Sequence, residues 1–245
     1  MCIRDRTSAA LRFPFKNKSL TEAEILNLLS DADPETRKIA GKSLSEVLEN
    51  NKRIFGMILN VISRDRYIED NKRGFKRIMS SRNLDNDVED EVVDKLVNTV
   101  NKAMPKLTHR YYKWKANQFG QTKLDWWDRN APLPHSSETF IKWSEAKDII
   151  LDSFSSFHPE ISNLAELFFK NNWIDASLRK GKASGAFAHP SVPSLHPYIL
   201  VNYQGTIRDV MTLAHELGHG VHQILAGKNG LLMAETPLTL AETAS

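Results

Sequence analysis

The stretch TLAHELGHGVH, residues 212–222, constrains the fold of this chain more than any other short segment. Apolar residues recur at helical spacing along it and its flanks: Val210, Leu213, Leu217, Val221 and Ile224. This spacing predicts an amphipathic helix from about Arg208 to Ala226, with its apolar side packed on a core. Residues four apart on a helix share a face, so His215 and His219 are expected to point the same way.

Two imidazoles on one helix face are typical of a metal site. Glu216 is expected about 100° round the helix from His215, beside a cation that the two histidines hold. This is the zincin arrangement, in which two His ligands and a general-base Glu surround a metal-bound water. The alternative is a solvated polar face. Because Cys2 is the only cysteine, the ligands of any metal must be His and carboxylate.

A catalytic zinc site needs a third protein ligand. His222 shares the helix face, but seven residues of helix place it about 10.5 Å along the axis from His215, too far for one ion. The remaining candidates are two downstream carboxylates, Glu235 and Glu242. Glu242 lies in the next predicted helix, which can hold its side chain rigidly, whereas Glu235 precedes that helix at a looser position.

The rest of the chain predicts a mainly α fold with a small β element before the metal-binding helix. Thr21 and Glu24 have capping-box spacing, and Asp33 followed by Pro34 marks the start of another helix. The segment RIFGMILNVISRDRYI, residues 53–68, is apolar over most of its circumference, which predicts a separate helix between others. We expect an N-terminal helical domain over residues 7–90 and a catalytic domain over residues 91–245.

Composition excludes several classes of partner. The net charge of +3 is small for 245 residues, so the chain has no strongly basic surface of the kind that binds nucleic acid. No apolar run approaches the ~20 residues of a membrane span. A single cysteine favours a reducing compartment, and we expect a cytoplasmic protein. The sequence does not predict the oligomeric state.

Three segments together resemble a known family: RKGKASGAF, HPYILVNYQGTIRDVMTLAHELGHGVHQ and PLTLAETAS. They resemble the oligoendopeptidase F branch of the thimet-oligopeptidase-like zinc metallopeptidases, with likeness from about residue 20 to the end. The resemblance implies one zinc ion held by His215, His219 and Glu242, the last from ETAS, with Glu216 as general base. It also implies that the strand Pro197–Tyr203 is an edge strand that pairs with substrate backbone.

The resemblance therefore predicts a zinc-dependent endopeptidase that hydrolyses short peptides, with Glu216 acting on a zinc-bound water. Two alternatives remain: a metallocarboxypeptidase of similar helical fold, and a helical binding module without catalysis. Members of this family continue beyond the third ligand, with a His and a Tyr that bind substrate and stabilise the oxyanion. We expect the chain to be a fragment truncated at its C-terminus and inactive by itself.

Overall fold

A computed structural model of the chain describes residues 3–134 and 140–244. The chain divides into two compact units, Met1–Ser136 and Ser137–Ser245. The compact units divide after residue 136, whereas the predicted catalytic domain begins at residue 91. A division by compactness does not show where the catalytic domain begins, so the boundary after residue 90 stays a prediction. The predicted fold class is confirmed, because helices predominate and the strands are few and short. Among the helices that the structure describes, none is both long and apolar enough to cross a membrane.

The first unit consists of helices and one short hairpin. Its elements are α1 (Ile3–Ala10), β1 (Phe13–Phe15), β2 (Lys18–Leu20), α2 (Glu22–Asn27), η1 (Leu28–Ser30), α3 (Pro34–Lys72), α4 (Ser80–Asp85), α5 (Asp90–Ala103), α6 (Thr108–Gln118) and η2 (Trp126–Asp128). Both predicted helix starts are confirmed. Thr21 and Glu24 form a capping box at α2, and the Asp33 carboxylate accepts from two backbone N–H groups at the start of α3.

The predicted separate helix over residues 53–68 is wrong, because α3 is one continuous helix from Pro34 to Lys72. The single glycine inside the segment, Gly56, costs a helix only about 1 kcal/mol relative to alanine, too little to end it. The expected burial is also wrong within the described residues. The side chains of Met57 and Leu59 are 59% and 64% exposed.

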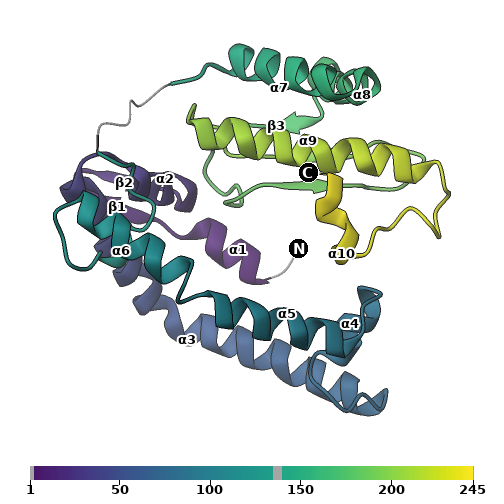
Figure 1. Ribbon diagram of the computed structural model, residues 1–245, viewed down its shortest axis with the longest axis horizontal. Coiled ribbons are helices and arrows are strands. Elements are labelled where there is room, and N and C mark those ends of the chain that lie inside the picture. Colours follow the sequence, from purple (N-terminus) through teal and green to yellow (C-terminus); the bar gives the residue numbers. More distant parts are fainter. Residues whose placement is uncertain (1–2, 135–139, 245) are drawn as a thin grey trace. The chain divides into compact units, whose positions relative to one another are not determined.

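The second unit packs three helices around a small sheet. Its elements are α7 (Trp143–Phe157), α8 (Pro159–Lys170), β3 (Ile174–Asp175), β4 (Phe187–His189), β5 (Tyr198–Leu200), α9 (Ile207–Gly227), α10 (Leu238–Ala241) and η3 (Glu242–Ala244). Figure 1 shows α7 and α8 side by side, with the long helix α9 next to them. Phe168 of α8, Ile199 of β5 and Leu217 of α9 are buried in one core.

The sheet corrects the expectation for the strand Pro197–Tyr203. This segment forms β5, which is the central strand of the order β3-β5-β4. β3 pairs with it in parallel and β4 pairs with it antiparallel, Ala188 lying opposite Ile199. The strands at the two edges of this sheet are therefore β3 and β4, and β5 is not an edge strand. The two flanking strands are only two and three residues long, so no alternating pattern revealed them in the sequence.

Candidate metal centre

The position of α9 is set by its first turn and its apolar side. The hydroxyl of Thr206 accepts from the backbone N–H of Asp209 at 3.1 Å, and the Asp209 carboxylate accepts from the backbone N–H of Thr206 at 2.9 Å. This reciprocal cap satisfies two donors that the helix itself leaves free. The apolar positions predicted from the sequence pack against the sheet and α8, with Leu213 and Leu217 fully buried. The histidines are consequently on the side that remains more open.

His215, His219 and Glu242 lie together in the structure. The two imidazole Nε2 atoms are 3.2 Å apart. The carboxylate Oε2 of Glu242 is 3.5 Å from Nε2 of His215 and 3.6 Å from Nε2 of His219. Among the residues that the structure describes, this is the one group of His, Cys, Asp or Glu close enough to share a metal ion. Glu242 is the C-cap of α10 and the first residue of the 3-10 helix η3, which continues α10 directly.

The spacing of these three atoms fits a zinc ion. In tetrahedral coordination with bonds of about 2.1 Å, any two ligand atoms lie about 3.4 Å apart. The three separations in the structure, from 3.2 to 3.6 Å, match that value with both imidazoles and the carboxylate already turned to one point. Two nitrogens and one oxygen are also the donor set of a catalytic zinc site with three protein ligands.

Glu216 is buried beside this group, with only 6% of its surface exposed. Burial raises the pKa of its carboxyl, while His215, His219 and a hydrogen bond from the backbone N–H of Ala188 act in the opposite direction. Ala188 is the middle residue of β4, the edge strand that packs beside α9. A raised pKa makes a carboxylate a stronger base, which suits a group that accepts a proton and releases it again.

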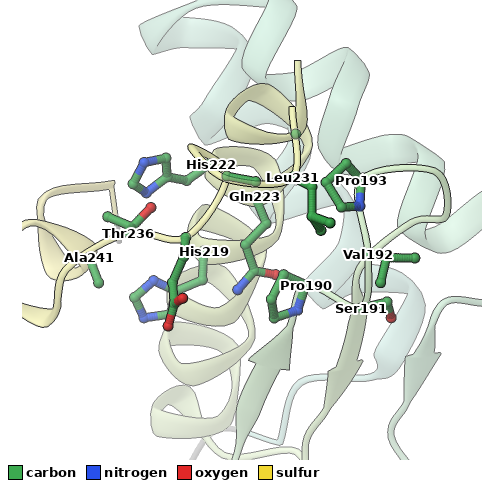
Figure 2. A pocket seen from close by; sticks show the side chains of 13 residues that line it. Pro190, Ser191, Val192, Pro193, His219, His222, Gln223, Leu231, Thr236 and Ala241 are labelled. Atoms are coloured by element: carbon green, nitrogen blue, oxygen red, sulfur yellow. The ribbon is translucent and has the colours of Figure 1, made fainter. Parts of the chain in front are cut away.

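His222 and Glu235, the two weaker candidates for a metal ligand, line a neighbouring cavity of about 390 Å³. Figure 2 shows His219, His222 and Gln223 on one side of it, and Pro190, Val192 and Pro193 on the loop opposite. Glu235 also lines this cavity and is exposed, outside the group around His219. The cavity opens beside His219, so a molecule that reaches the metal group has adjoining space to occupy.

Sequence reasoning missed the contribution of Ala188. Its N–H group acts to lower the pKa of Glu216, and its carbonyl accepts from Nε2 of Gln223 at 3.4 Å. Both groups belong to the backbone, so the type of side chain at position 188 carries no signal for them. Only the segment RKGKASGAF, singled out for its resemblance, pointed to this part of the chain.

Comparison with known proteins agrees with this geometry. The model of a family described as Peptidase family M3 matches residues 27–245. Oligopeptidase PepF of Bacillus subtilis (strain 168) is 27% identical over 213 residues, which are 86% of this chain and 31% of that protein. An oligoendopeptidase F homolog of Borreliella burgdorferi is 30% identical over 227 residues, which are 91% of this chain and 38% of the relative.

A solved structure, PZ peptidase A with inhibitor 2, has the same fold over the matched part. It superposes with a TM-score of 0.89 at 20% identity, covering 98% of this chain and 44% of its own. The chain thus spans about a third of the length of the curated relatives described above, with shares of 31% and 38%.

Proposed function

Because the chain belongs to peptidase family M3, we propose that the protein is a zinc-dependent endopeptidase that hydrolyses short peptides. The observation that carries the proposal is the convergence of two imidazole nitrogens and one carboxylate oxygen next to a buried glutamate. The names of the relatives, oligopeptidase and oligoendopeptidase, support peptides as the substrate class.

In this proposal His215, His219 and Glu242 hold one Zn²⁺ ion. The ion supplies Lewis acidity, which polarises a peptide carbonyl and makes a neighbouring water molecule more acidic. The chain contributes the geometry, because α9 presents the two imidazoles and η3 brings the carboxylate to them. Three protein ligands leave a coordination position open, as catalysis requires.

Glu216 is the general base. Its carboxylate accepts a proton from the attacking water and passes it to the nitrogen of the leaving amine. Burial keeps the carboxylate out of bulk water and favours its protonated form, so it binds a transferred proton readily.

The proposal places the protein in the cytoplasm, without nucleic-acid or membrane partners. Its support is compositional, because a chain with one cysteine and a net charge of +3 carries no internal disulfide and no strong basic field.

The test is Glu216→Gln in the full-length protein, with the exposed Glu235→Gln as a matched control. Glu216→Gln should keep its zinc and lose about 10²–10⁴-fold in turnover of an internally quenched peptide, because the base is removed and no ligand is lost. Glu235→Gln should keep both its zinc and its turnover. A Glu216→Gln variant within about tenfold of the wild type would refute the assigned role.

The same assay separates the alternatives. An endopeptidase cleaves an internally quenched peptide whose C-terminus is amidated, whereas a carboxypeptidase requires the free carboxylate and should leave that peptide intact. A binding module would hold zinc and peptide without any hydrolysis.

A further inference from the structure

The segment between β3 and β4 is held by a buried lysine. The side chain of Lys182 is 1% exposed, and its Nζ donates to the carbonyls of Asp175, Ser177 and Val201 at 2.9, 2.9 and 2.6 Å. The Asp175 carboxylate lies 3.1 Å from the same ammonium. One side chain thus joins the ends of β3 and β5 to the segment that leads into β4.

Asn202 supplies a second anchor on the same segment. Its amide nitrogen donates to the carbonyl of Ala183 at 3.0 Å and to that of Gly185 at 2.9 Å. Gly185 has φ +81°, a conformation that L side chains rarely adopt, so the turn between the anchor and β4 depends on glycine. We call residues 182–185 together with Asn202 the clamp.

Along the chain, the clamp lies directly before β4. Gly185 is three residues before Ala188, so only about 10 Å of extended backbone separates the anchored carbonyl from Ala188, whose own carbonyl accepts from Gln223 of α9. A shift of the clamp is therefore passed on to β4 with little slack. β5 holds β4 on its other side through the pairs Phe187–Leu200 and His189–Tyr198.

We propose that Lys182 and Asn202 are positioning residues, which fix β4 against α9, the helix that carries His215, Glu216 and His219. Burying an ammonium is costly, and packed apolar residues often stabilise a fold as well or better. The ammonium provides what an apolar residue cannot, namely directed bonds to three backbone carbonyls at two strand ends. Its consequence for turnover rests on the proposed function, but the effect on β4 does not.

The test compares Lys182→Met with Lys180→Met. Methionine has similar length and no donors, and Lys180 is exposed two residues away on the same segment, which makes it a matched control. Hydrogen exchange of peptides that cover residues 183–189 should become about tenfold faster or more in Lys182→Met, with peptides from α9 unchanged. Turnover per bound zinc in the full-length protein should fall on the order of 10²-fold, while zinc affinity is kept. Lys180→Met should match the wild type in every measurement.

Two results would overturn the inference. One is unchanged exchange at residues 183–189 in Lys182→Met. The other is faster exchange throughout α9 with loss of zinc, which would make the lysine a general stabiliser of the unit. If Lys182→Met does not fold, Asn202→Ala removes the other anchor and should show the same local pattern. A full-length wild type that binds zinc and hydrolyses no peptide would refute the proposed function, and the exchange measurement would still decide whether the clamp positions β4.

Discussion

Gly220 determines how closely α8 approaches the metal-binding helix. A Cβ atom at this position would lie 2.5 Å from Cζ of Phe168, whose side chain is fully buried. Such a distance is far shorter than any van der Waals contact, so a side chain at position 220 must push the two helices apart or move the ring. His219, the proposed metal ligand, is the preceding residue, so a displaced α9 displaces it too.

We therefore expect Gly220→Ala to lower the free energy of unfolding by about 1–3 kcal/mol, the usual cost of overpacking a core. Gly227→Ala is the matched control, because a Cβ there meets only Pro193, at 3.8 Å. Urea denaturation of both variants measures the difference. Equal stability of the two would contradict the close packing of Phe168 on Gly220.

Asp175 gives the clamp a dependence on pH. Hydrogen bonds from Arg179 and Lys182 lower the pKa of its carboxyl. A carboxyl whose pKa is lowered by folding stabilises the folded state above its unfolded pKa of about 3.9, and that contribution disappears as pH falls through the lowered folded value. We expect Asp175→Asn to melt at a lower temperature than the wild type at pH 7. The gap should close as the pH falls below about 4. A gap that is independent of pH between 7 and 3 would show that the charge of Asp175 contributes nothing.

At the scale of elements, long helices with local signals could be predicted and short strands could not. The spacing of apolar residues predicted α9 and the side on which His215 and His219 lie, because helix geometry fixes both. The third candidate ligand could not be predicted from helix geometry in this way. Spacing left Glu235 and Glu242 open, and only the resemblance selected Glu242, since the loop after α9 has no periodic pattern that fixes its path.

Tertiary packing explains the remaining differences. β3 and β4 are too short to show alternation, and their pairing with β5 depends on contacts distant in sequence. The continuity of α3 was missed because polar residues near its middle resemble a helix end, although none of them stops a helix. The Glu216–Ala188 contact could not be predicted before β4 had been placed.

At the scale of the whole molecule, all the residues of the candidate site lie within one unit, Ser137–Ser245. His215, Glu216, His219 and Glu242 all come from its last 31 residues, 215–245. The relatives are about three times as long as the part of them that this chain matches, with matched shares of 31% and 38%.

The central claim is that His215, His219 and Glu242 form one zinc site. Equilibrium titration with zinc, at fixed pH and with a chelating competitor, tests it most directly. The wild-type chain should bind one zinc ion. Glu242→Gln should weaken binding by more than about 10-fold, since a ligand is a larger loss than the outer groups whose removal costs 10–100-fold. Glu235→Gln, the matched control, should bind zinc as the wild type does. Normal affinity in Glu242→Gln together with weakened affinity in Glu235→Gln would contradict the account.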